Sequence, residues 1–222
     1  MPFRILVVDG HPVTREGFRA LIGRSDDLTL DHEVDTAGDA LDRLAAGAPD
    51  LVLADVSLPG MDGIEMTKRL RSEHPAVPVL VVSAASEDIY APRAIRAGAR
   101  GFVSKRQSGE AILDAIRAVL NGHVVVADGV RDRLLNQYLD HDPHAQPVDV
   151  LSDRELEVLT LIGQGLRTTD IAARLGISPK TVETHRVHVK DKLSLQTTNE
   201  LVRWAALWVE SERLTHERPA SA

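Results

Sequence analysis

Two patterns of apolar residues divide this sequence. From residue 3 to about residue 121, short runs rich in Val, Ile and Leu alternate with segments of helical periodicity. Beyond residue 150 the chain carries short helical patterns and no strand-like run. The pattern therefore predicts an α/β domain followed by a smaller all-helical domain.

The apolar runs of the first part predict five strands. We place them at Phe3–Asp9, about Thr29–Val34, Leu51–Asp55, Val77–Ser83 and Gly101–Ser104. Runs such as LVLAD and VPVLVVS are apolar throughout, which is typical of parallel strands buried on both faces. Five βα units follow, with helices on both faces of the sheet.

In the second part, residues that favour helix N-caps mark the helix starts. These are Ser152, which forms a capping box with Glu155, then Thr168, Ser178 followed by Pro179, and Thr197 with Glu200. Gly176 is expected to make the turn between the second and third of these helices. The order is helix, tight turn, helix, as in many DNA-binding domains.

These patterns set the expected domain bounds. We expect an α/β domain over residues 1–122, a further helix and a linker over 123–150, a helical domain over 151–210 and a frayed tail over 211–222. The stretch DHDPHAQPVDV at 140–150 is polar, contains two prolines and lacks periodicity, which is typical of a linker.

Charge and composition narrow the function. The 222 residues carry a formal charge of -7, so any contact with nucleic acid must come from a local basic patch. The absence of cysteine excludes disulfides and thiolate zinc sites. No apolar run approaches the roughly 18 residues of a membrane span, so we expect neither a signal peptide nor an anchor, no membrane partner, and a cytoplasmic protein.

Four polar residues lie at or just past predicted strand ends: Asp9, Asp55, Ser83 and Lys105. In α/β sheets of this kind the chemistry sits at the carboxyl ends of the strands. A carboxylate nucleophile, a second acid that holds a cation, a hydroxyl and a lysine are the parts of an aspartyl-phosphate site. A single strand-end Asp is more often a helix cap, but four such residues together favour the phosphoryl site.

The third helix of the second part is locally basic. Residues 179–192 hold four Lys or Arg and two acids, in a chain that is acidic overall. A solvated surface helix of mixed charge is the simpler interpretation of such a segment. The caps, the turn and the charge together favour a DNA-reading helix instead.

Both parts resemble one family. Residues 3–121, through ILVVD, PDLVLADVSLPGMDGIE, VLVVSA and AGARGFVSK, resemble a response-regulator receiver domain, which has a flavodoxin-like (βα)5 fold. Residues from about 148 to 210, through LSDRELEVLTLIGQGL, DIAARLGISPKTVETHRVHVKDKL and TTNELVRWA, resemble the LuxR-type helix-turn-helix of the NarL/FixJ family. The two resemblances cover nearly the whole chain in the order of that family.

The resemblance implies a DNA-binding transcription regulator of a two-component system. In it, Asp55 accepts a phosphoryl group from a sensor histidine kinase, Ser83 and Lys105 sense the group, and Phe102 moves with the switch. Family members bind near-palindromic promoter sites as homodimers. Toward DNA, the resemblance places Thr181, Thr184, His185 and Arg186 in the major groove, and Lys180, Lys190 and the amino end of the Thr168 helix on phosphates. Glu183 can accept a hydrogen bond from a cytosine amino group or pair with Lys180 or Arg186 on its own helix, and the pairing is expected.

Gly10 departs from the receiver pattern. Receivers carry two adjacent acids at the end of the first strand, and here only Asp9 is present. Asp9, Asp55 and a carbonyl near Ser57 can still offer oxygens to Mg²⁺, but the site should be weakened. His11 is not expected to replace the acid, because imidazole is a poor ligand for this hard cation. We therefore expect the phosphoacceptor to persist while magnesium-dependent phosphorylation is impaired.

Three alternatives stay open. The chain can be a DNA-binding regulator that works without phosphorylation, or an antagonist whose helical domain binds a protein partner. An aspartyl phosphatase is disfavoured because Ser57 stands where a general-acid Asp would be expected; apart from a receiver's own phosphorylation chemistry we expect no enzyme. The pairs His185 with His188 and His141 with His144 are interpreted as surface histidines, not metal ligands.

Overall fold

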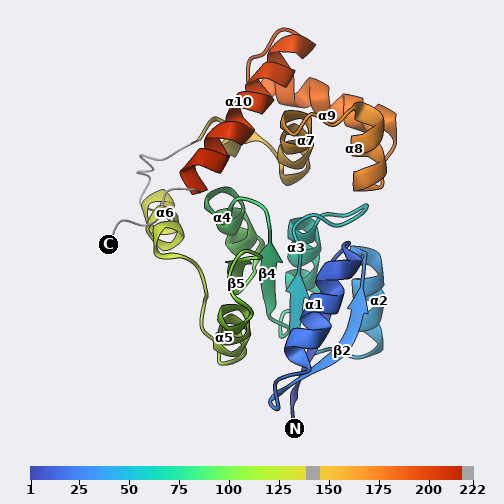
Figure 1. Ribbon diagram of the computed structural model, residues 1–222, viewed down its shortest axis with the longest axis vertical. Coiled ribbons are helices and arrows are strands. Elements are labelled where there is room, and N and C mark those ends of the chain that lie inside the picture. Colours follow the sequence, from blue (N-terminus) through green and yellow to red (C-terminus); the bar gives the residue numbers. More distant parts are fainter. Residues whose placement is uncertain (139–145, 217–222) are drawn as a thin grey trace. The chain divides into compact units, whose positions relative to one another are not determined.

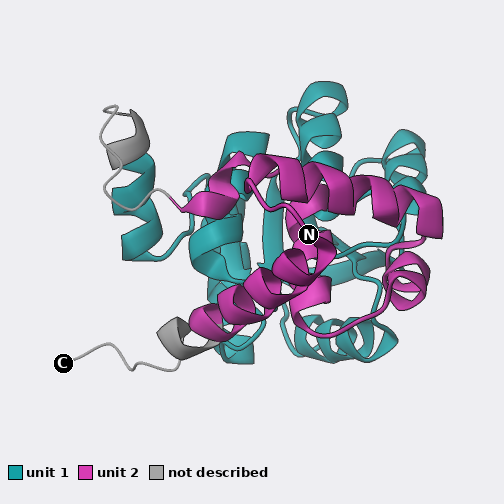
Figure 2. Cartoon of the chain, turned by 90° about the horizontal axis from the view of Figure 1, so that it is seen from above, with its two compact units in different colours: residues 1–144 teal, residues 145–222 magenta. Residues whose placement is uncertain are grey.

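A computed structural model describes residues 1–138 and 146–216. The chain forms two compact units, residues 1–144 and 145–222 (Figure 2).

The first unit is a five-stranded parallel sheet with helices on both faces (Figure 1). Its elements are β1 (Phe3–Val8), α1 (Pro12–Ile22), β2 (Leu28–Val34), α2 (Ala37–Ala46), β3 (Leu51–Ala54), α3 (Gly63–Glu73), β4 (Val79–Ser83), α4 (Glu87–Ala97), β5 (Gly101–Ser104), α5 (Gly109–Leu120) and α6 (Asp128–Tyr138). The strand order is β2-β1-β3-β4-β5. This is the flavodoxin-like (βα)5 arrangement expected from the sequence.

The strands agree with the expected ones except at their ends. Strand β4 begins at Val79, not Val77, because Pro78 has no amide hydrogen to donate to a neighbouring strand. The Val77 amide instead closes a turn onto the carbonyl of His74, at 3.0 Å. Strands β1 and β3 each stop one residue before the acid that we had included. Asp9 and Asp55 therefore stand just beyond the sheet.

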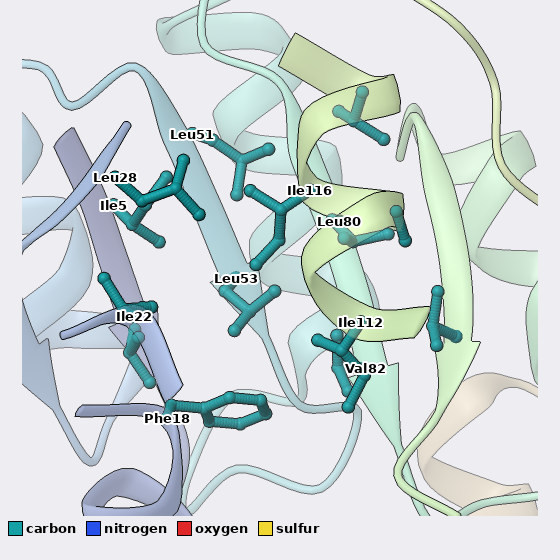
Figure 3. Packing of buried hydrophobic residues seen from close by; sticks show 14 residues of the cluster. Ile5, Phe18, Ile22, Leu28, Leu51, Leu53, Leu80, Val82, Ile112 and Ile116 are labelled. Carbon is teal, nitrogen blue, oxygen red and sulfur yellow. The ribbon is translucent and has the colours of Figure 1, made fainter. Parts of the chain in front are cut away.

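The core that supports the strand ends lies between the sheet and two helices. Figure 3 shows Phe18 and Ile22 of α1 and Ile116 of α5 packed against strand residues such as Leu53. These side chains are almost fully excluded from water, and each contributes about 1.5–3 kcal/mol by burial. The strand ends are consequently held on a rigid base.

The chain after α5 returns to the sheet. The Phe102 amide donates to the Val125 carbonyl at 2.8 Å, and the Val125 amide donates to the Arg100 carbonyl at 3.0 Å. Helix α6 follows and packs on α4, where the Arg133 guanidinium donates to the Asp88 carbonyl at 3.0 Å. The segment thus covers the edge of β5 with backbone hydrogen bonds.

The second unit is helical. It contains a short 3-10 helix, η1 (Pro147–Val150), and helices α7 (Asp153–Gly163), α8 (Thr168–Leu175), α9 (Pro179–Lys192) and α10 (Thr198–His216). The predicted capping box of Ser152 and Glu155 is confirmed, as is the Ser178 cap before Pro179. Thr197 also caps as predicted, since its hydroxyl accepts from the Glu200 amide at 3.2 Å.

The prediction that Thr168 caps α8 is wrong. Thr168 is the first residue inside the helix, Arg167 holds the N-cap position, and no side chain caps it. The Thr168 hydroxyl instead donates to Glu183 Oε1 on α9, at 2.7 Å. A contact between two helices has taken the group that local sequence assigned to a cap.

Both ends of the second unit extend past the expected bounds. Val148 is fully buried, so residues 147–150 are part of the folded unit and not linker. Helix α10 continues to His216, because residues 211–216 contain good helix formers and no Gly or Pro. Linker residues 140–145 and the last six residues of the chain lie outside the described residues. No helix in the described ranges is long and apolar enough to cross a membrane.

Candidate phosphoryl site and nucleic-acid interface

Strand register brings Asp9 and Asp55 together. Val8 of β1 pairs with Ala54 of β3, so the next residue of each strand leaves the sheet at the same edge. The Asp55 amide donates to the Val8 carbonyl at 2.9 Å, which continues the ladder by one bond. Both acids are almost completely buried, with 1% and 4% of their surface exposed.

The Asp55 carboxylate is the centre of the cluster. Its Oδ1 accepts from the Ser83 hydroxyl at 2.6 Å and from the Val56 amide at 2.7 Å. Its Oδ2 accepts from Lys105 Nζ at 2.7 Å. Ser83 and Lys105 reach it because they end or follow the adjacent strands β4 and β5, and the Lys105 amide donates to the Ser83 carbonyl at 2.9 Å.

Lys105 also contacts the second acid, Asp9. Its ammonium lies 2.6 Å from Asp9 Oδ2, so one cation bridges two buried carboxylates. Two like charges so close together would be costly without such a partner. The site therefore carries its own charge compensation.

Gly10 faces the loop that follows Asp55. A Cβ at position 10 would lie 3.2 Å from Pro59 Cδ and 3.8 Å from the Ser57 carbonyl oxygen. A side chain at position 10 would therefore lie against the loop that follows Asp55, and glycine offers no side-chain ligand there.

Sequence reasoning set aside His11, yet the structure brings its ring into the cluster. Nδ1 of His11 lies 3.2 Å from Asp9 Oδ1 and 3.9 Å from Asp55 Oδ2. The backbone amide of His11 also donates to Asp9 Oδ1, at 2.8 Å. The signal in the sequence was the spacing Asp-x-His at a strand end, which a short turn folds back on itself.

Phe102, the expected switch aromatic, is buried in β5 with 1% of its surface exposed. Its side chain lines an open cavity of about 480 Å³ between β5, α5 and residues 125–127. Strand β5 connects Phe102 to the carboxylate cluster, because Lys105 directly follows the last residue of this strand.

The candidate DNA-reading helix α9 divides into an exposed row and a packed row. Lys180, Thr181 and Thr184 are exposed, as expected for residues that meet a groove. Val187 is also exposed, at 48%, one turn beyond Thr184. Sequence reasoning missed Val187 because an apolar residue on a helix is usually assigned to the core.

Arg186 and Thr168 join α9 to α8. The Arg186 guanidinium donates to Thr168 Oγ1 at 3.0 Å and lies 3.7 Å from Glu183 Oε2, and its side chain is only 13% exposed. The predicted pairing of Glu183 with Arg186 is present. The triad fixes the angle between the two helices of the turn motif.

His185 lies on the side of α9 that is near Arg154 and Glu155 of α7. His185 is partly buried, and burial, together with the nearby charge of Arg154, lowers the pKa of its imidazole below the ordinary value. Lys190 is half-buried. Glu155 of α7 holds this side of α9, since its Oε2 accepts from Lys192 at 2.6 Å and its Oε1 lies 3.5 Å from His188 Nδ1.

Burial of the Glu155 carboxyl on its own would raise its pKa. Hydrogen bonds from Lys192 and from Ser152 outweigh burial, so the pKa of Glu155 is lowered and the carboxylate form is favoured. The capping box of α7 and the inner side of α9 thus share one buried anion.

Comparison with known families covers both units. Residues 5–117 match the response regulator receiver domain, and residues 149–205 match the bacterial regulatory proteins of the luxR family. The chain is 33% identical to the Fimbriae Z protein of Salmonella typhimurium, over 92% of this chain and 96% of that protein. It is 32% identical to the oxygen regulatory protein NreC of Staphylococcus haemolyticus, over 91% and 96%.

Solved structures of response regulators also match this chain. A LuxR-family response regulator from Aurantimonas sp. SI85-9A1 matches with 32% identity and a TM-score of 0.57, over 63% of this chain and 99% of that one. RcsB of Salmonella enterica serovar Typhimurium, solved bound to promoter rprA with the phosphomimetic BeF3-, shares the fold at 22% identity, with a TM-score of 0.61, over 93% and 99%. The chain belongs to the two-component response regulators that join a receiver domain to a LuxR-type DNA-binding domain, and it is a DNA-binding transcription regulator.

Proposed function

We propose that Asp55 is the phosphoacceptor and that its phosphorylation by a sensor histidine kinase controls DNA binding by the second unit. One observation carries the proposal: the Asp55 carboxylate lies between the Ser83 hydroxyl and the Lys105 ammonium. Those two groups are the ones that a phosphoryl group on Asp55 would meet first.

The chemistry follows from these contacts. An oxygen of Asp55 attacks the phosphorus of the donor, the bond from phosphorus to the donor's leaving group breaks, and the leaving group takes that electron pair. Lys105 and Ser83 then transfer their hydrogen bonds from the carboxylate to the phosphoryl oxygens. Mg²⁺, when bound by Asp9 and Asp55, would offset the charge on the incoming oxygens. Gly10 removes one oxygen ligand, so we propose that this assistance is weakened.

For DNA, we propose that the exposed row of Lys180, Thr181 and Thr184 meets the major groove and its phosphates. The amino end of α8 at Thr168 and the half-buried Lys190 complete the phosphate contacts. Arg186 and His185 are more enclosed, so their part is to position the row rather than to reach bases in this arrangement. A homodimer on a near-palindromic site is the assembly that such a small module needs for affinity.

The first test is intact-protein mass after incubation with acetyl phosphate, with and without Mg²⁺. We expect one phosphoryl adduct on the wild type and none on Asp55→Asn. Asp114→Asn, on the exposed face of α5, is the matched control and should label like the wild type. A slow, weakly Mg²⁺-dependent adduct is the result expected for the Gly10 site. Labelling of Asp55→Asn at the wild-type level would contradict the assignment.

A phosphorylation-independent regulator is the second candidate. Its supporting observation is the Lys105 bridge, which contacts both acids and offsets one of their two negative charges without a metal or a phosphoryl group. In that case the unmodified chain binds specific DNA, and acetyl phosphate changes neither the affinity nor the mass. If the helical unit instead binds a protein partner, no salt-sensitive, sequence-specific DNA complex forms at all.

A further inference from the structure

We infer that Asp9, His11 and Asp55 form a site for a divalent transition-metal ion such as Zn²⁺, which they bind in preference to Mg²⁺. His11 supplies a nitrogen ligand in the position left without an acid by Gly10. The inference deepens the proposed phosphoacceptor site and rests on it for its biological role, although metal binding itself can be measured without phosphorylation.

The donor atoms are already gathered. One ligand atom from each of the three side chains lies within 4.8 Å of the others, and two of the separations are 3.2 Å and 3.9 Å from His11 Nδ1. Two ligands bound tetrahedrally at about 2.1 Å from one zinc ion are themselves about 3.4 Å apart. The side chains need only small rotations to share an ion.

The set of donors fits Mg²⁺ poorly. Mg²⁺ requires a near-octahedral shell of oxygens at about 2.0–2.1 Å and rarely takes nitrogen. Here the buried carboxylates of Asp9 and Asp55 are the acids at this edge, and position 10 adds no oxygen. The imidazole that approaches them would occupy a place in the shell that Mg²⁺ fills with water or carboxylate.

The same donors suit a softer ion. Imidazole together with carboxylates is a common ligand set for Zn²⁺ and its neighbours, which bind nitrogen more strongly than Mg²⁺ does. The His11 side chain makes no capping hydrogen bond to α1, and its Nδ1 lies at hydrogen-bond distance, 3.2 Å, from Asp9 Oδ1, a contact that a shared metal ion would replace. The ring is 53% exposed, so the site is open on one side to water and to an entering ion.

Lys105 is the internal competitor. Its ammonium already contacts Asp9 Oδ2 and Asp55 Oδ2, whereas His11 approaches Asp9 through the other oxygen, Oδ1. A dication on the His11 side therefore shares only Asp55 Oδ2 with Lys105. We expect metal affinity to be moderate for this reason, and to rise in Lys105→Met.

The experiment is calorimetric titration of the full-length chain with ZnCl₂ and, separately, with MgCl₂, in a buffer that does not bind metal. The wild type should bind one Zn²⁺ at least about tenfold more tightly than Mg²⁺. His11→Ala should lose roughly 10- to 100-fold in Zn²⁺ affinity and leave Mg²⁺ affinity nearly unchanged. Gly10→Asp should narrow the difference between the two ions by strengthening Mg²⁺ binding, once Pro59 yields to the new side chain.

A matched control separates this site from ordinary surface histidines. His32 Nδ1 lies 3.3 Å from Asp31 Oδ2, so it forms the same kind of His-carboxylate pair without a second acid, and His32→Ala should bind Zn²⁺ like the wild type. A Co²⁺ titration adds a readout of the ligands, since the visible band of the bound ion should disappear in His11→Ala. Thermal unfolding of each variant without metal checks that the fold is intact.

Equal Zn²⁺ affinity in the wild type and in His11→Ala, or tighter binding of Mg²⁺ than Zn²⁺ by the wild type, would overturn the inference. So would the absence of any binding, which would leave Lys105 as the cation of the site. These outcomes are independent of the proposed function. A phosphoryl adduct that requires Asp55 supports the phosphoacceptor whichever metal binds, and its absence beside His11-dependent Zn²⁺ binding would leave the metal site standing alone.

Discussion

At the scale of single residues, solvent exposure distinguishes basic side chains that the sequence pattern assigns to the same role. Lys180 and Arg186 are both basic residues of α9, and both were assigned to DNA. Lys180 is exposed, whereas the Arg186 side chain is 13% exposed and bound to Thr168 and Glu183. A charge that faces water can pair with phosphate, but a charge that is already paired holds two helices together.

This difference predicts opposite effects of two alanine variants. Lys180→Ala should weaken DNA binding about equally for all sequences and lower the salt slope of binding by about one, with unchanged stability. Arg186→Ala should lower the free energy of unfolding of the second unit by about 1–3 kcal/mol, because it removes the guanidinium that contacts both Thr168 and Glu183 and leaves only the hydrogen bond between those two. Both tryptophans lie in α10, so tryptophan fluorescence during urea unfolding reports on this unit. Equal stability of the two variants would refute the distinction.

His185 predicts a pH dependence. Burial and the charge of Arg154 lower its pKa in the folded state from the ordinary 6.5, so the unfolded chain takes up the proton first as pH falls. The stability contributed by the neutral ring is complete above pH 6.5 and is lost progressively below it. In the wild type, the free energy of unfolding measured by fluorescence should therefore be lower at pH 5.5 than at pH 7. In His185→Gln the difference between the two pH values should be smaller.

The pH range of that experiment lies above the range in which the Glu155 carboxylate takes up a proton. Its pKa lies below the ordinary 4.5, so its contribution is present above pH 4.5 and is lost only as pH falls further. Above pH 5 the two groups can be separated. A His185→Gln variant with the same pH slope as the wild type would show that another group controls it.

At the scale of elements, helix packing in the second unit depends on one glycine. Gly163 ends α7 where α10 crosses it, and a Cβ there would lie 2.4 Å from the Ala205 carbonyl oxygen and 2.6 Å from Val209 Cγ2. A Cβ at this distance would clash with the backbone of Ala205, and the close-packed helices cannot shift to relieve the clash without a loss of packing. Close approach of the two helices therefore requires the absence of a side chain at this position.

Gly163→Ala should consequently destabilise the second unit by about 1–3 kcal/mol, through overpacking. Gly17 of α1 is the matched control, since a Cβ there would meet nothing within 4 Å. Gly17→Ala should leave the second unit unchanged and stabilise the first by up to about 1 kcal/mol, through helix propensity. Fluorescence follows the second unit and circular dichroism follows both. Unchanged fluorescence unfolding in Gly163→Ala would contradict the packing argument.

At the scale of the molecule, each unit has its own core. The first is built on the sheet with α1 and α5, and the second on α7 to α10. The chain divides into two compact units, so we expect stability to be divided between them as it is between domains. The acidic site depends on the first core and the α9 surface on the second.

Leu53→Ala tests that division. Leu53 is 1% exposed in β3 and belongs to the first unit's core. The variant should lose about 2–5 kcal/mol of stability in the first unit, while the fluorescence transition of α10 keeps its midpoint. Calorimetry should show one transition moved and one unmoved. A shift of both transitions by the same amount would indicate a single cooperative unit.

Local sequence determined much of this protein. The parallel strands, the caps at Ser152 and Ser178 and the turn at Gly176 all follow from the apolar period and from hydrogen bonds within a few residues. Motif resemblance supplied the family, and register then brought the predicted Asp9, Asp55, Ser83 and Lys105 into one cluster.

Other features were decided only by tertiary structure. The fold placed His11 against both acids, gave the Thr168 hydroxyl to Glu183 instead of to a cap, and enclosed Arg186 between helices. The physical reason is the same in each case. A side chain takes the strongest partner within reach, and partners that lie far apart in sequence come within reach only when strands align and helices pack.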